Sequence, residues 1–217
     1  MGRVASRSVV KDSSALGVVM EDRLHLGAFN RPVPGWLNTD ITPHIFLAKI
    51  PFAPLALRLL GRVTPERLAE HRAGIFRRLR YLNAAKCFPF PSQSVSAIYT
   101  SHMLEHLYPW HAETCLRECL RVLKPDGVLR IAVPDLEQIV ARFESSHPAE
   151  FLRHIFEYGH GLAKNSHRWH YTNKSLCDLL IAVGFRAATT CSYRQGCCPD
   201  LYLIENRPDS LFVEAVR

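Results

Sequence analysis

The sequence predicts a single α/β domain with a mainly parallel sheet covered by helices on both faces. Short apolar strand patterns alternate with helical patterns, and 217 residues are enough for one domain with a buried core. The composition, with 47% apolar and 22% charged residues, is typical of globular proteins and excludes a disordered or collagen-like chain. Residues 1–20 are small and polar and are expected to form a flexible leader before a domain over 21–217.

The first half of the chain predicts four strands. The alternating run 23–27 ends in a glycine turn, and a second strand follows at 36–41. The eight residues between them are fewer than the roughly ten that a helical crossover needs, so an abbreviated first crossover is expected. Two further strands are predicted at 80–83 and 95–100.

Residues 43–80 form a predicted helical insertion. The apolar run 45–60 is interrupted by two prolines and two cations, and it is shorter than the roughly 20 residues that span a bilayer. Thr64-Pro65-Glu66 then indicates a helix start, followed by a basic face. The segment fits additional core, a lid, a dimer contact or an element resting on acidic lipid.

The second half predicts helices alternating with strands. A helix at 111–123 ends in the turn Lys124-Pro-Asp-Gly127. The elements expected after it are a strand at 128–133, helices at 136–143, 149–158 and 172–184, and strands at 185–193 and 210–216.

Charge and cysteine usage limit the partners. The formal net charge is +7, which favours anionic partners without choosing among nucleic acid, lipid headgroups and acidic glycans. The seven cysteines include no Cys-x-x-Cys pair, and the first 20 residues lack the apolar core of a secretory signal. We therefore expect a reduced, cytoplasmic protein without a bound metal.

Residues that follow the first four strands define a candidate ligand site, because parallel sheets bind ligands beyond the carboxyl ends of their strands. A glycine turn lets backbone approach a ligand, and a carboxylate after the next strand can accept the two hydroxyls of a ribose. An asparagine can recognise a base edge. The chain has no glycine-rich phosphate loop, so it favours a nucleoside without phosphate. The positions are Gly27-Ala28-Phe29, Asp40, Asn83-Ala84 and Ser101-His102.

An ordered set of motifs resembles a known family. The set begins with Leu24-His-Leu-Gly27, Pro34-Gly-Trp-Leu-Asn-Thr-Asp40 and Ser101-His-Met-Leu-Glu-His-Leu107. It continues with Glu118-Cys-Leu-Arg-Val-Leu-Lys-Pro-Asp-Gly127, His167-Arg-Trp-His-Tyr171 and Asn206-Arg-Pro-Asp-Ser-Leu-Phe-Val-Glu-Ala215. Together they resemble the class I S-adenosylmethionine-dependent methyltransferases, in particular a small glycan-associated group of the type 11 kind. The resemblance covers roughly 22–217 except 43–80, and it implies a Rossmann-like, seven-stranded sheet whose last strand is antiparallel.

The resemblance also implies a cofactor site for S-adenosylmethionine. By position, Gly27 would line its methionine part, Asp40 would hold the ribose hydroxyls, Asn83 and Ala84 would face the adenine, and Ser101 and His102 would lie near the sulfonium. Two positions depart from the family. Phe29 stands where a second glycine is usual, and Asn83 replaces a common aspartate. The phenyl ring would either crowd the cofactor or swing out and cover it.

Transfer of a methyl group to a hydroxyl also needs a proton acceptor near the acceptor oxygen. The catalytic candidates are His106, His102 and Asp135, with Glu105, His167 and His170 as further possibilities. Each also has a structural reading: Glu105 and His106 open a helix, Asp135 can cap one, and His167 and His170 belong to an aromatic patch.

The expected function is therefore O-methylation of a sugar or a small cell-surface-glycan precursor. Two alternatives stay open. The first is a methyltransferase-like domain that lost cofactor affinity through Phe29 and acts as a binding module. The second is an RNA or protein methyltransferase that uses its basic face, although no RNA-binding module is visible, so nucleic acid is not the expected partner.

Overall fold

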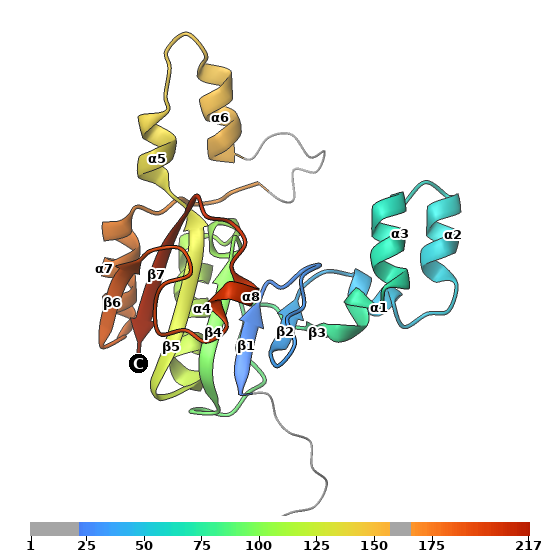
Figure 1. Ribbon diagram of the computed structural model, residues 1–217, viewed down its shortest axis with the longest axis horizontal. Helices are drawn as coiled ribbons and strands as arrows, with labels where there is room; N and C mark the ends of the chain where they lie inside the picture. The colour runs from blue at the N-terminus through green and yellow to red at the C-terminus, as the bar shows by residue number, and fades with distance from the viewer. Residues whose placement is uncertain (1–21, 157–165) are drawn as a thin grey trace, which may run out of the picture.

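The computed structural model describes residues 22–156 and 166–217, so the predicted leader lies outside the described residues. A seven-stranded sheet with the order β3-β2-β1-β4-β5-β7-β6 forms its centre (Figure 1). The strands are β1 (Arg23–Leu26), β2 (Leu37–Asp40), β3 (Arg80–Tyr81), β4 (Val95–Ser101), β5 (Leu123–Pro134), β6 (Ala187–Cys191) and β7 (Ser210–Val216).

The predicted sheet and its abbreviated first crossover are confirmed. β1 pairs in parallel with β2 on one side and with β4 on the other. Only β7 runs against its neighbours, since it pairs antiparallel with both β5 and β6. The strand order reverses between β1 and β4, and a sheet of this kind binds ligands at the carboxyl edge of that switch point.

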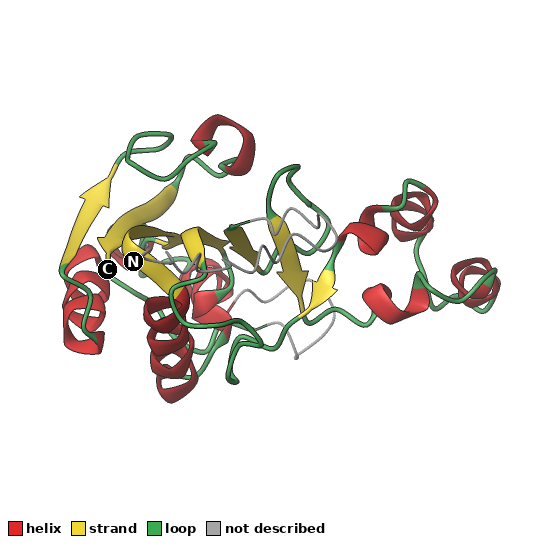
Figure 2. Ribbon diagram, turned by 90° about the horizontal axis from the view of Figure 1, so that it is seen from below, coloured by secondary structure: helices red, strands yellow, loops and turns green. Residues whose placement is uncertain are grey.

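The two faces of the sheet are covered unequally (Figure 2). Helices α4 (Pro109–Val122) and α7 (Asn173–Val183) pack on one face over the main apolar core. On the other face, a smaller cluster joins Trp36 and Tyr99 to the short helix α8 (Leu201–Ile204). Sequence analysis missed α8, whose four residues are too few to show a helical period. The second face is thus covered mainly by connecting segments rather than by the expected long helices.

The predicted turn at 124–127 is absorbed into a strand. β5 begins at Leu123, which pairs with Val95 of β4, and the next paired residues are Val128 and Ala97. Residues 124–127 of β5 therefore lie opposite the single residue Ser96 of β4 and form a bulge. Within this bulge, Asp126 takes a left-handed conformation (φ 59°). The prediction of a turn that separates helix and strand was therefore wrong, because the main-chain pairing with β4 begins before these residues and resumes after them.

The segment between β2 and β3 is helical, as expected, and extends to one side of the sheet (Figure 1). It contains α1 (His44–Leu47), α2 (Ala53–Leu59), α3 (Pro65–Arg72) and the 3-10 helix η1 (Ile75–Arg78). Its own small core joins Ile45, Ala48, Phe76 and Leu79 to Ala28 of the β1–β2 connection. Helix α2 buries none of its side chains.

Two further helices follow β5 and stand above its carboxyl end (Figure 1): α5 (Leu136–Ala141) and α6 (Pro148–Phe156). A 3-10 turn, η2 (Leu104–His106), precedes α4, so Glu105 and His106 lie in this turn rather than at the start of the long helix. Among the helices of the described ranges, none has the length and apolar character that crossing a membrane requires.

Candidate functional site

The ends of β1 and β2 are tied together by Asp40. Its Oδ2 accepts a hydrogen bond from the Phe29 backbone N–H (3.0 Å), and its Oδ1 accepts one from the Thr42 N–H (2.7 Å). Burial raises the pKa of this carboxyl above its ordinary value, although the backbone donors partly oppose the shift. Each carboxylate oxygen has a second lone pair, so Asp40 is still able to accept hydroxyl hydrogens from a ligand.

Gly27 ends β1 in a conformation that requires glycine. Its φ is +73°, and a Cβ at this position would lie 2.8 Å from Cγ of Met103. Met103 follows β4, so the two strands that flank the switch point approach closely here. A larger residue would be strained by its backbone and would push the loop after β4 outward.

Phe29 points toward the helical segment. The Arg67 guanidinium of α3 lies 4.4 Å from the ring centroid, and the ring is 40% exposed. The next residue, Asn30, donates to Glu70 of α3 (2.7 Å), and Glu70 also pairs with Arg67. The β1–β2 connection and α3 are therefore joined by a cation–π contact and a polar network. In this orientation the ring packs against the helical segment.

The other predicted cofactor positions lie after the neighbouring strands. Asn83 follows β3, and its side-chain oxygen accepts from the Ala85 N–H, which fixes a turn and leaves its amide NH₂ available. Ala84 packs against the main core. Ser101 ends β4 next to His102. These residues share the carboxyl edge of the sheet with Gly27 and Asp40, on strands that are neighbours in the order β3-β2-β1-β4.

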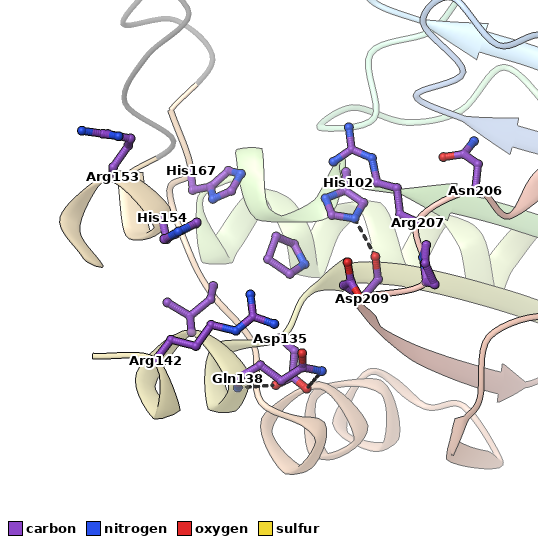
Figure 3. A pocket seen from close by; sticks show the side chains of 14 residues that line it. His102, Asp135, Gln138, Arg142, Arg153, His154, His167, Asn206, Arg207 and Asp209 are labelled. Atoms are coloured by element: carbon purple, nitrogen blue, oxygen red, sulfur yellow. Dashed lines mark hydrogen bonds between the residues drawn. The ribbon is translucent and has the colours of Figure 1, made fainter. Parts of the chain in front are cut away.

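A cleft of about 600 Å³ opens beside this edge, between β4, β5, the helices α5 and α6 and the start of β7 (Figure 3). Its charged lining has three arginines, Arg142, Arg153 and Arg207, against two carboxylates, Asp135 and Asp209. His102, His154 and His167 add three imidazoles. The cleft is therefore net cationic and suits a ligand that carries an anionic group.

His102 sits between the cleft and a buried carboxylate. Its Nε2 lies 2.8 Å from the Ser210 Oγ, and its Nδ1 lies 3.3 Å from Oε1 of Glu105, whose side chain is fully buried. The backbone of His102 has a φ of 49°, which is unusual for a non-glycine residue and directs this side chain. A carboxylate behind one imidazole nitrogen leaves the other nitrogen to exchange a proton with a ligand.

The remaining catalytic candidates occupy different places. Asp135 caps α5, accepting from the N–H groups of Glu137 and Gln138, and it also lines the cleft. His106 lies behind the cleft lining, where its ring is 5.0 Å from that of His167. His170 contacts His167 from the other side, and its Nε2 is 2.6 Å from the Ile155 carbonyl oxygen.

Sequence reasoning missed most of the cleft wall. Arg142 and Arg153 belong to predicted helices but gave no sign that they face a ligand. Arg207 and Ser210 belong to the closing motif, which had been noted only for its resemblance. That motif follows α8 and lies next to His102 only because β7 inserts between β5 and β6.

Similarity to known proteins bears on the fold. Residues 63–131 match a family model described as a methyltransferase domain. A structure of an S-adenosylmethionine-dependent methyltransferase from Archaeoglobus fulgidus is 12% identical, with a TM-score of 0.53 over 90% of this chain and 85% of that one. This chain has a methyltransferase fold. Its α/β architecture is that of the Archaeoglobus fulgidus structure.

Two further similarities are more limited. A curated relative from Mycolicibacterium smegmatis, named as a probable S-adenosylmethionine-dependent methyltransferase, is 32% identical over 85 residues. These residues make up 38% of this chain and 32% of the relative, so the match spans about a third of that protein's length. A methyltransferase structure from Aquifex aeolicus is 12% identical, with a TM-score of 0.44 over 89% of this chain and 80% of that one.

Proposed function

We propose that this methyltransferase fold binds S-adenosylmethionine and transfers its methyl group to a hydroxyl of a sugar or another small glycan precursor. The observation that supports it best is the pairing of Gly27 and Asp40 at the switch point of the sheet. Gly27 leaves backbone exposed to the ligand, and Asp40 offers a carboxylate to the ribose hydroxyls of an adenosyl group.

The cleft next to this site supports a hydroxyl acceptor. The cofactor supplies an activated methyl group, so the protein has to align the acceptor and remove its proton. His102 fits the second task, because Glu105 lies behind its Nδ1 while its Nε2 reaches the side of the cleft formed by Ser210. The arginines of the cleft suit an acceptor with a phosphate or carboxylate, as a charged glycan precursor would have.

Titration of the purified protein with S-adenosylhomocysteine in a calorimeter tests the proposal. We expect a 1:1 complex, and we expect Asp40→Ala to weaken it by at least about 100-fold, because two hydrogen bonds to a charged acceptor are lost. The affinity of Asp40→Asn, which keeps one acceptor oxygen, should lie between those of the parent and Asp40→Ala. No heat and no thermal shift with millimolar ligand would instead favour a binding module that has lost the cofactor.

The salt dependence of binding tests whether RNA is the methyl acceptor instead. A protein that binds RNA through its basic face should lose affinity steeply as the salt concentration rises, because released counterions dominate such binding. We expect weak retention of RNA at physiological salt and methyl transfer to small anionic glycosides. Strong, salt-sensitive RNA binding would instead favour an RNA methyltransferase over one that acts on small glycosides.

A second proposal concerns the outer surface of the helical segment, for which we infer contact with an anionic lipid surface. Its large apolar side chains face solvent: Phe52 is 82% exposed, Leu59 81% and Leu60 72%. Residues 41–65 contain no Asp or Glu, whereas Lys49, Arg58 and Arg62 lie among the apolar residues. Apolar side chains flanked by cations are typical of helices that lie in the headgroup region of a membrane.

Sedimentation with vesicles tests the lipid contact. We expect binding to phosphatidylcholine vesicles that contain phosphatidylglycerol and little binding to phosphatidylcholine alone, with loss of binding in Phe52→Ser/Leu59→Ser. A matched control, Tyr202→Ser/Leu203→Ser, removes two exposed apolar side chains of α8 and should bind normally. Equal sedimentation of both double variants would contradict the proposal, and a dimer that only Phe52→Ser/Leu59→Ser dissociates would assign the surface to a second copy of the chain.

A further inference from the structure

Glu105 is the most unusual buried group in the described residues. Its side chain has no solvent exposure, and neither of its carboxylate oxygens has a hydrogen-bond partner. An ionised carboxylate in such a place is costly unless a cation or several donors compensate it. Two histidines lie close to it, with His102 Nδ1 3.3 Å and His167 Nε2 3.9 Å from Oε1, and the buried Tyr171 phenol also interacts with it electrostatically.

The surroundings of Glu105 provide the ligand types of a transition-metal site. One oxygen of Glu105 and one ring nitrogen each from His106 and His167 lie within 4.8 Å of one another. Bonds of about 2.0–2.2 Å from zinc to nitrogen and oxygen allow two ligands of one ion to be up to about 4 Å apart. Small side-chain rotations would therefore bring all three atoms onto one ion.

We propose that Glu105, His106 and His167 bind one divalent transition-metal ion at the floor of the cleft. Two imidazoles and one carboxylate are the ligands of many zinc, manganese and iron sites in which a further position stays open. Mg²⁺ prefers oxygen ligands and is not expected to compete. The expectation of no metal rested on cysteine spacing, which gives no information about a site made of histidine and glutamate.

The position of the three ligands explains what the ion would do. His167 belongs both to this group and to the cleft lining, so the ion would lie next to the cleft. His167 and His170 come from the segment after α6, whereas Glu105 and His106 come from η2. The backbone holds these segments together, since the N–H groups of Arg168 and Trp169 donate to the Glu105 carbonyl oxygen (2.7 and 3.1 Å).

The role in catalysis rests on the proposed function, but the binding of the ion does not. An acceptor hydroxyl on the open position would lose its proton more easily, because the ion stabilises the alkoxide. The proton passes to His102, the alkoxide oxygen forms the new bond to the methyl carbon, and the bond between that carbon and sulfur breaks. S-Adenosylhomocysteine and the methyl ether are the products.

Metal binding is measured on the full chain without an affinity tag, using Zn²⁺ by calorimetry and Co²⁺ by its visible absorption. We expect one ion per chain and an increase in Tm, and we expect Glu105→Gln and His106→Ala each to weaken binding at least tenfold. Without metal, Glu105→Gln should keep or raise the Tm, because it removes a buried carboxyl group whose oxygens have no hydrogen-bond partner.

The matched control is Glu144→Gln/His147→Ala. These residues form an exposed pair (3.5 Å) with the same spacing along the chain as His102 and Glu105, and their loss should leave metal binding unchanged. Absence of a stoichiometric ion, or equal affinity in Glu105→Gln and the parent, would overturn the site. A protein that binds Zn²⁺ but not S-adenosylhomocysteine would keep the metal site and refute the proposed function.

Discussion

At the scale of single residues, three residues of the proposed site have an unusual backbone conformation. Gly27, Phe29 and His102 have positive φ angles, and all three follow a strand that borders the switch point. For the two non-glycine residues this conformation costs roughly 1–3 kcal/mol each, so the surrounding structure must maintain it. The sequence predicted all three as site residues and a turn at Gly27, but it gave no sign of the conformations of Phe29 and His102.

His25 in β1 provides a prediction about pH. Burial is the main cause that lowers the pKa of this imidazole to about 4, against a hydrogen bond with Asn38 that acts in the opposite direction. Below about pH 6.5, His25 therefore binds a proton in the unfolded chain but stays neutral in the folded chain until the pH reaches about 4. The free energy of unfolding consequently falls as the pH drops from 6.5 to 4. We expect this residue to account for up to about 3 kcal/mol of that loss.

The measurement is urea unfolding over that pH range for the parent and for His25→Gln, which keeps a polar group near Asn38. The variant should show a flatter dependence on pH, even if it is less stable at neutral pH. Parallel curves for the two proteins would mean that His25 does not cause the effect.

At the scale of elements, helix ends are well determined by local sequence. Thr172 accepts from the Ser175 N–H, and the Ser175 hydroxyl lies 2.9 Å from the Thr172 backbone nitrogen, so both residues form a capping box at the start of α7. Gly184 ends the same helix in a left-handed conformation (φ 116°). The helix predicted over 172–184 agrees with these ends because each signal acts within four residues of its helix end.

The cap of α7 provides a stability prediction. Thr172→Ala removes the acceptor for an N–H of the first turn, and we expect a loss of about 1 kcal/mol and a decrease of about 2–4 °C in Tm. Thr172→Ser, which keeps the hydroxyl oxygen, should restore most of this. Thermal unfolding followed by circular dichroism checks both values, and a neutral Thr172→Ala would show that tertiary packing alone holds the end of α7.

At the scale of the whole molecule, a buried ion pair joins segments that are distant in sequence. Arg130 of β5 is fully buried, and its Nε donates to Oε1 of Glu205 (2.7 Å), which follows α8. The same guanidinium donates to the carbonyl oxygens of Ser192 and Gln195 (2.9 Å each), between β6 and α8. These bonds fix α8 and the connection to β7, and β7 begins at the cleft wall.

Loss of this pair should therefore affect the entire domain. Glu205→Ala leaves the Arg130 guanidinium buried without its nearest carboxylate, and we expect a destabilisation of about 3–5 kcal/mol. Denaturant unfolding with unchanged m-value checks it. Glu113→Ala serves as a control, since its ion pair with Arg117 (2.6 Å) is exposed and should contribute less than about 1 kcal/mol. A similar loss in both variants would contradict the special role of Arg130.

The sequence by itself determined the order and type of most elements, the position of the helical segment and the placement of Gly27, Asp40 and His102 at strand ends. These depend on local propensity and on the rule that parallel strands present their carboxyl ends at one edge. Only the tertiary structure decided that Phe29 contacts Arg67, that Arg142 and Arg207 share a cleft, and that the Glu105 carboxylate lies among histidines from two segments. Such contacts join residues far apart in the chain, and side-chain direction and burial follow from packing that no local pattern encodes.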